Sequence, residues 1–111
     1  MSDELKNKKC KPCEEKTGRL PHEEVEKLSE EIDRWHIIED KSIEKTFKFA
    51  DFATALAFVN KVGVIAEAEN HHPDIHLTDW NKVMLSLSTQ SIGGLSENDF
   101  ILAAKIDEIG R

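Results

Sequence analysis

Two pairs of strand-like segments, separated by one long helical segment, restrict the fold of this 111-residue chain more than any other feature. Apolar and polar residues alternate over Lys82–Thr89, as in a strand with one buried face. They also alternate over Ser42–Phe49, where only Lys45 interrupts the apolar row. A shorter strand-forming segment precedes each run, at residues 35–38 and 74–78, so the sequence predicts two hairpins.

Three helical patterns surround these strands. Apolar residues at positions i, i+3 and i+7 predict a short amphipathic helix over residues 22–33. Asp51 suits the N-cap of a second helix that reaches Glu69, and Asn70 is a residue type that commonly ends a helix. The broad apolar stripe of this second helix predicts a central position in the fold. Ser96–Asp99 is similar to a capping box and predicts the start of a last helix.

The order of these elements, α-β-β-α-β-β-α, predicts an α+β fold. We expect a four-stranded antiparallel sheet with the three helices on one face. Residues 1–19 lack periodicity and are predicted to be an irregular lead-in, which leaves a single domain over residues 20–111. An open sheet has two unpaired edges, and small domains often cover an edge with another subunit. We therefore expect a homodimer or a homotetramer.

The charge distribution argues against binding to nucleic acid. The chain has 22 acidic and 15 basic residues, and the excess of acidic residues lies after residue 20. Such a surface repels a phosphate backbone. No apolar segment approaches the roughly 20 residues of a membrane span, and the start of the chain has no apolar signal segment. We expect a cytoplasmic protein that contacts neither nucleic acid nor membranes.

The two cysteines, Cys10 and Cys13, form a Cys-x-x-Cys pair. Such a pair supplies half of a structural zinc site, but the chain has no second pair. A redox pair normally lies at a junction of strand and helix, whereas this one lies in the lysine-rich lead-in. Ordinary reduced thiols are the simplest interpretation, and the metal and redox roles stay open.

Three of the five histidines lie within Asn70–His76. A helix is predicted to end there and Pro73 fixes the exit of the chain, so the loop is held by rigid neighbours yet stays open to a ligand. Histidine donates or accepts protons near neutrality, so His71 and His72 could supply a general acid and its partner. Two alternatives stay open: a metal site with nearby carboxylates, and a structural cap in which the rings bond the last helix carbonyls.

Seven residues in and around this cluster have the spacing of a known family. Glu67 is followed by His71-His72-Pro73, then by Trp80, by Gln90 and by Asp99, with the intervals that the family shows. The stretch Gly-Leu-Ser-Glu-Asn-Asp around the last of these looks like the family's helix entry. Over nearly the whole chain the sequence resembles the pterin-4a-carbinolamine dehydratases.

The resemblance implies an enzyme that dehydrates 4a-hydroxytetrahydropterin to quinonoid dihydropterin in tetrahydrobiopterin recycling, without a metal or an organic cofactor. It implies that His71 is the acid that assists departure of the hydroxide, and that His72 positions the substrate or accepts a proton. The family usually has a histidine where this chain has Gln90, which can hold a hydroxyl or the ring but cannot move a proton. The residues expected to bind the pterin are Glu67, Pro73, Trp80, Ser88, Thr89 and Asp99.

Several of these assignments compete with a structural role. Glu67 lies one helical turn before His71 and is expected to orient it, unless it is a solvated helix carboxylate. Trp80 is either a wall of the pterin pocket or a packing residue, and Asp99 either belongs to the site or closes the capping box. For the protein as a whole, Gln90 keeps two alternatives open: a catalytically weakened relative that binds or helps assemble another protein, and an enzyme of molybdopterin metabolism.

Overall fold

The computed structural model describes residues 5, 7–8, 10 and 19–110. Within these residues it contains three α-helices, one short 3-10 helix and one sheet. The elements are, in chain order, α2 (His22–Ser29), β1 (His36–Ile38), β2 (Ser42–Lys48), α3 (Phe52–Glu69), β3 (Asp74–Thr78), β4 (Lys82–Leu87), η2 (Gln90–Ile92) and α4 (Glu97–Ile109). This order confirms the predicted sequence of helices and strands.

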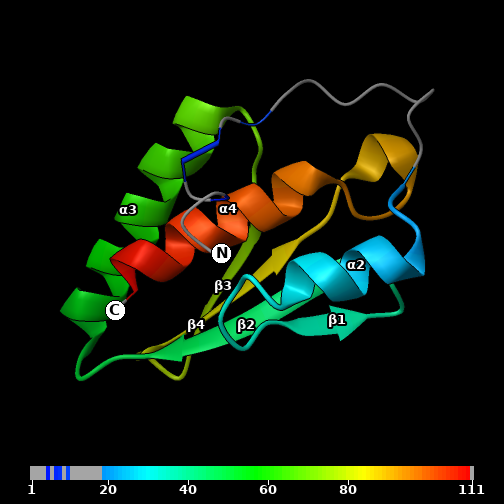
Figure 1. Ribbon diagram of the computed structural model, residues 1–111. Coiled ribbons are helices and arrows are strands. Elements are labelled where there is room, and N and C mark those ends of the chain that lie inside the picture. Colours follow the sequence, from blue (N-terminus) through cyan, green and yellow to red (C-terminus); the bar gives the residue numbers. More distant parts are fainter. Residues whose placement is uncertain (1–4, 6, 9, 11–18, 111) are drawn as a thin grey trace.

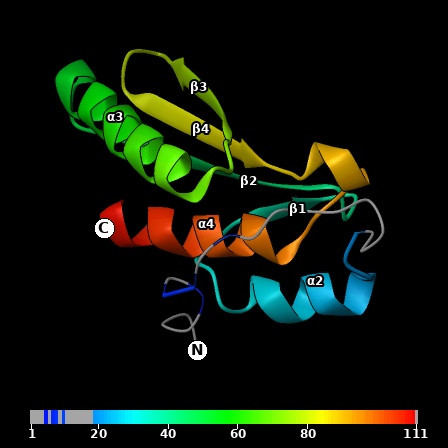
Figure 2. The same ribbon diagram turned by 90° about the horizontal axis from the view of Figure 1, so that it is seen from above.

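The four strands form one antiparallel sheet in the order β1-β2-β4-β3. Both predicted hairpins are present, as β1–β2 and β3–β4, and the pairing of β2 with β4 joins them. Figures 1 and 2 show the three helices on the same face of the sheet, with α4 between α2 and α3. The predicted α+β architecture is therefore confirmed.

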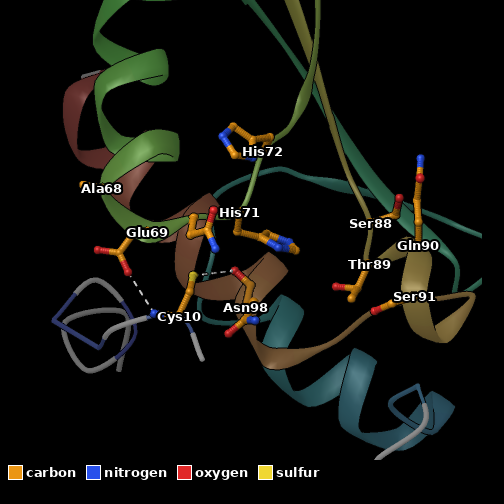
Figure 3. A pocket seen from close by; sticks show the side chains of 11 residues that line it. Cys10, Ala68, Glu69, His71, His72, Ser88, Thr89, Gln90, Ser91 and Asn98 are labelled. Carbon is orange, nitrogen blue, oxygen red and sulfur yellow. Dashed lines mark hydrogen bonds between the residues drawn. The ribbon is translucent and has the colours of Figure 1, made fainter. Parts of the chain in front are cut away.

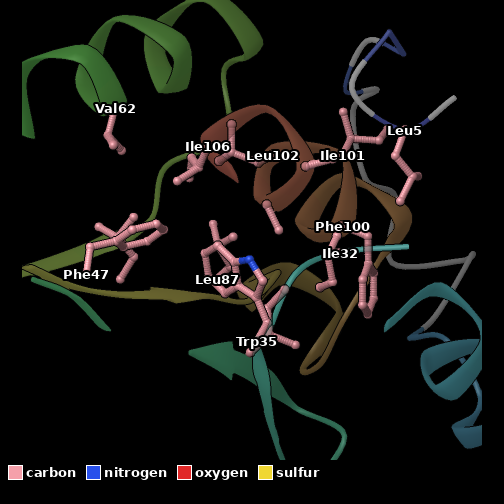
Figure 4. Close-up of a cluster of buried hydrophobic side chains, with 14 of the residues drawn as sticks. Leu5, Ile32, Trp35, Phe47, Val62, Leu87, Phe100, Ile101, Leu102 and Ile106 are labelled. Atoms are coloured by element: carbon pink, nitrogen blue, oxygen red, sulfur yellow. The ribbon is translucent and has the colours of Figure 1, made fainter. Parts of the chain in front are cut away.

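The hydrophobic core lies between the sheet and α4, and Figure 4 shows part of it. The inward residues of the two central strands are Ile43, Phe47, Val83, Leu85 and Leu87. Helix α4 buries nine of its 13 residues, whereas α3 leaves Phe52, Leu56 and Val64 exposed. The predicted central position of α3 is therefore wrong. Helix α4 takes that position instead, since it packs against both α2 and α3 and lies between them on the sheet.

Helix α2 ends four residues earlier than its apolar pattern predicts. Its last residue is Ser29, although Ile32 is still buried beyond that end. The backbone N–H of Asp33 donates to Oδ2 of Asp107 on α4 at 2.9 Å. This bond turns the chain toward α4, so Ile32 reaches the core from a turn rather than from a helix.

The interruption of the apolar row in β2 has a structural explanation. The Nζ of Lys45 donates to Oδ1 of Asp107 at 2.8 Å, and the indole N–H of Trp35 donates to the same oxygen at 3.0 Å. Lys45 and Asp107 are 13% and 5% exposed, so this is a nearly buried ion pair with its hydrogen bonds satisfied. It ties β2 and the start of β1 to α4.

Some described residues before α2 also contact the domain. Leu5 is 2% exposed and belongs to the core. The predicted irregular lead-in, residues 1–19, falls mainly outside the described residues, as does Cys13. The lead-in and the domain boundary at residue 20 therefore stay predictions. Among the described helices, none combines the length and the apolar character that a membrane span requires.

Candidate active site

A cavity of about 670 Å³ lies where the end of α3, the end of β4 and the start of α4 meet (Figure 3). The residues that line it are Cys10, Ala68, Glu69, Asn70, His71, His72, Ser88, Thr89, Gln90, Ser91 and Asn98. They come from segments far apart in the sequence, and most of them are polar. The histidine loop and the residue at position 90 therefore line one cavity.

The end of α3 places His71 at this cavity. Asn70 has the left-handed conformation, with φ 53° and ψ 41°, and its backbone N–H donates to carbonyls of the last turn. The N–H of His71 donates to the carbonyl of Ala66 at 3.2 Å. These bonds satisfy carbonyls that a helix end leaves unpaired, and they fix the direction in which His71 leaves the helix.

His71 forms a short hydrogen bond with a buried carboxylate. Its Nε2 lies 2.6 Å from Oδ1 of Asp99, whose side chain is 0% exposed, while the His71 side chain is 13% exposed. The other carboxylate oxygen, Oδ2, accepts bonds from the Thr89 hydroxyl at 2.8 Å and from the Ser96 N–H at 2.9 Å. The latter bond belongs to the capping box of α4. Asp99 therefore both closes the capping box and orients His71.

This arrangement determines which ring nitrogen of His71 can serve a ligand. An ionised carboxylate only accepts hydrogen bonds, so beside ionised Asp99 the proton lies on Nε2 of His71. Nδ1 is then the nitrogen left for a ligand in the cavity. A histidine held by a carboxylate on one nitrogen and open on the other is a common arrangement for proton transfer.

His72 has a different partner. Its Nε2 lies 2.7 Å from Oε2 of Glu67, and both side chains are more than half exposed. The expectation that Glu67 orients His71 is therefore wrong, because Glu67 contacts the following histidine and Asp99 takes the predicted role. Figure 3 shows the ring of His72 directed away from that of His71. The two rings thus present separate proton-carrying groups.

The opposite side of the cavity follows the end of β4. The strand ends at Leu87, two residues before its predicted end, because the chain turns back through Gly93, whose φ is 68°. The N–H of Thr89 donates to the carbonyl of Gly94 at 2.8 Å and closes this turn. Gln90 begins η2 and is exposed. In Figure 3 its side chain points in the same direction as that of Ser88.

Four of the six predicted substrate-binding residues are not among those that line the cavity: Glu67, Pro73, Trp80 and Asp99. Glu67 and Asp99 contact the two histidines instead. Trp80 lies in the β3–β4 turn, at the other end of the hairpin from His71, and is 60% exposed. Pro73 is half-buried next to the histidines and is not among the lining residues. His76 lies on β3, away from the lining residues. Within the described part of the chain, no three His, Cys, Asp or Glu side chains are placed to hold a metal ion.

Sequence reasoning missed other lining residues. Cys10 was assigned to the lead-in, yet its N–H donates to Oε1 of Glu69 at 2.8 Å and its thiol lies 3.7 Å from the carbonyl of Asn98 (Figure 3). Glu69 lies two positions after Glu67 in the sequence, and Asn98 comes directly before Asp99. Only proximity to the motif could have identified them, since no spacing singled them out.

The family model described as pterin 4 alpha carbinolamine dehydratase matches residues 18–109. A protein of Nitrosospira multiformis, named provisionally as a pterin-4-alpha-carbinolamine dehydratase, is 46% identical over 96% of this chain and 93% of its own length. The mitochondrial pterin-4-alpha-carbinolamine dehydratase 2 of Arabidopsis thaliana is 40% identical over 96% of this chain and 59% of its own length.

Solved structures agree with these matches. The transcriptional coactivator/pterin dehydratase of Brucella melitensis is 32% identical and has a TM-score of 0.79, over 85% of this chain and all of that one. A pterin dehydratase-like protein identified as a RuBisCO assembly factor is 22% identical with a TM-score of 0.57, over 69% of this chain and 87% of that one. The second likeness concerns the fold alone. From the family match and these identities, we conclude that the chain belongs to the pterin-4a-carbinolamine dehydratase family.

Proposed function

We propose that this protein dehydrates 4a-hydroxytetrahydropterin to quinonoid dihydropterin and thereby takes part in tetrahydrobiopterin recycling. The observation that carries this proposal is the pair of His71 and buried Asp99 at a polar cavity. Membership of the family supports the same reaction, and the names of the relatives supply the substrate class.

The reaction needs one proton at the leaving oxygen and loses one proton from N5. Protonated His71 donates from Nδ1 to the 4a-hydroxyl, so that the C4a–O bond breaks and water leaves. The electron pair of the N5–H bond then forms the C4a=N5 double bond. His72, paired with Glu67 at 2.7 Å, accepts the N5 proton and passes it to solvent. His71 takes up a proton from solvent before the next turnover, so the protons balance.

The role of Asp99 is to make His71 an effective acid. Its side chain is fully buried, and its Oδ1 accepts a hydrogen bond from the Nε2–H of His71 throughout the cycle. Charge-assisted bonds in a buried position are roughly twice as strong as neutral ones. The Thr89 hydroxyl is already committed to Asp99 and to Ser96, so Thr89 supports the carboxylate rather than contacting the pterin.

Gln90 stands where the family usually has a histidine, so a side chain that can orient the substrate replaces one that can also carry a proton. An amide donates and accepts hydrogen bonds, so Gln90 and Ser88 hold the ring or the hydroxyl at the β4 side of the cavity. Proton transfer then depends on the two histidines of the loop. The Trp80 side chain takes no part in the cavity of a single chain.

The homodimer or homotetramer and the cytoplasmic location belong to this proposal. Phe52, Leu56 and Val64 are between 42% and 71% exposed along α3. An apolar helix face of this kind favours self-association. Sedimentation equilibrium measures the oligomeric state, and fractionation of cells measures the location.

The test of the proposed reaction is the breakdown of freshly generated 4a-carbinolamine with and without purified protein. This intermediate dehydrates without a catalyst, so the background rate is measured in the same buffer. We expect a rate that rises in proportion to protein concentration. A protein that is folded by circular dichroism and leaves the background rate unchanged would contradict the proposal, and a search for a protein partner would follow.

A further inference from the structure

One residue that lines the candidate site, Cys10, comes from the amino-terminal part of the chain, and two described neighbours of it in sequence anchor that part to the domain. We call Leu5, Lys8 and Cys10 the amino-terminal wall. Leu5 is buried in the core, Lys8 pairs with Glu97 at 2.7 Å, and Cys10 lines the cavity. All three precede residue 18, where the match to the family model begins. The wall is therefore an addition to the part of the chain that the family model describes.

Glu69 is one of the residues that join this wall to the rest of the site. Its Oε1 accepts the backbone N–H of Cys10 at 2.8 Å, and its Oε2 lies 3.6 Å from Nζ of Lys105 on α4. The Glu69 side chain is 7% exposed, so both contacts are shielded from water. One carboxylate thus holds the end of α3, helix α4 and the amino-terminal wall together.

Cys10 is held from a second side as well. Its thiol lies 3.7 Å from the carbonyl of Asn98, the residue before Asp99 (Figure 3). The wall is therefore fixed next to the residue that precedes the buried carboxylate, and not to the carboxylate's own hydrogen bond with His71. A wall placed in this way affects how a ligand is enclosed more than how its proton is transferred.

We propose that Glu69 is a positioning residue which holds Cys10 against the cavity, so that the amino-terminal wall determines the affinity of the site for its pterin. This inference rests on the proposed function for the identity of the ligand. It makes Glu69 and Cys10 determinants of binding, whereas His71 and Asp99 determine the chemical step.

The test compares three variants in a Cys13→Ser background, so that Cys10 is the only thiol. Glu69→Ala removes the acceptor of the Cys10 N–H. Glu69→Gln removes the charge but keeps an oxygen that can accept this bond. Lys105→Met is the matched control, because it removes the ion pair and leaves the bond from Glu69 to Cys10 in place.

Four quantities are measured for each protein: kcat and KM for the carbinolamine, the Kd of 7,8-dihydrobiopterin, and the rate at which iodoacetamide alkylates Cys10. For Glu69→Ala we expect KM, Kd and the alkylation rate to rise about fivefold, the effect of one lost hydrogen bond, while kcat stays within about twofold. Glu69→Gln and Lys105→Met stay within about twofold in all of them. Bound 7,8-dihydrobiopterin slows the alkylation of Cys10 in the parent protein.

Several outcomes would overturn the inference. One is a Glu69→Ala protein with the parent's KM, Kd and alkylation rate, and another is a fall in kcat at constant KM. An equal rise in KM for Lys105→Met would assign the effect to the ion pair and to general stability. If Glu69→Ala does not fold, the parent protein still provides a test. Alkylation of Cys10 that is equally fast with and without 7,8-dihydrobiopterin would refute the proposal that the amino-terminal wall contacts the ligand. The Kd and alkylation need no turnover, so they test the wall even if the protein fails to accelerate dehydration.

Discussion

Replacement of Asp99 by asparagine tests the account of how His71 becomes an acid. In the structure, Oδ2 of Asp99 accepts from the Thr89 hydroxyl and the Ser96 N–H, and Oδ1 lies 2.6 Å from Nε2 of His71. In Asp99→Asn, the amide oxygen keeps the two donors on its own side. Its NH₂ group then faces Nε2 of His71, which must be unprotonated to accept it.

The change removes the acceptor that the imidazolium form of His71 requires. We expect kcat to fall about 10²–10⁴-fold, the range for loss of a correctly held acid or base, with a smaller change in KM. The side chain is fully buried, so the loss of its charge-assisted bonds also lowers the free energy of unfolding by about 1–3 kcal/mol.

The matched control is Glu67→Gln, which makes the same chemical change beside His72. That pair is more than half exposed, and exposed ion pairs contribute about 0–1 kcal/mol, so we expect a loss of about fivefold or less. Both variants are assayed by carbinolamine breakdown above background, and their folding is measured by urea titration. A folded Asp99→Asn protein that keeps the parent rate, or that loses no more than Glu67→Gln, would refute the reasoning.

Three further changes test other parts of the account. Gln90→His restores a proton-carrying group and should raise the dehydration rate in the same assay, whereas an unchanged or lower rate would show that the cavity is adapted to glutamine. Lys45→Met leaves the buried carboxylate of Asp107 without its cation and should lower the free energy of unfolding in urea by about 2–4 kcal/mol, so a loss below that range argues against the ion pair. The hydrogen bond to Asp40, then its charge, raises the pKa of His22 above its usual value of 6.5. The pair therefore stabilises the fold below about pH 6.5 and loses this effect as the pH rises through the raised pKa, so thermal melts of His22→Gln should lack that decline.

The elements of the fold could be predicted from local patterns, but their packing could not. Asp51 caps α3 through a bond from the N–H of Thr54 to its carboxylate, and Asn70 ends the helix in the left-handed conformation. Both caps depend only on residues close together in the sequence, so they could be predicted. The central position of α4 depends on how α2 and α3 pack against it on the sheet, and these contacts join segments far apart in the sequence. The early end of α2 depends on Asp107, far along the chain from Asp33.

The candidate site divides in the same way. The family spacing singled out His71, Gln90 and Asp99. In the structure His71 and Gln90 line one cavity, and Asp99 forms a hydrogen bond with His71. The spacing did not predict which carboxylate serves which histidine. Glu67 is the near neighbour of His71 in sequence, but the direction in which the chain leaves α3 gives His71 to Asp99 instead. Cys10 could not be placed at all, because its contacts with Glu69 and Asn98 have no periodicity behind them.

The central claim is that His71, held by buried Asp99, is the acid of a dehydratase. The most direct measurement is the carbinolamine breakdown rate of the wild-type protein and of His71→Ala, at equal concentrations of folded protein and corrected for background. The account predicts clear acceleration by the wild type and a loss of about 10²-fold or more in His71→Ala. Equal acceleration by the two proteins would contradict it, because the proton would then come from another group.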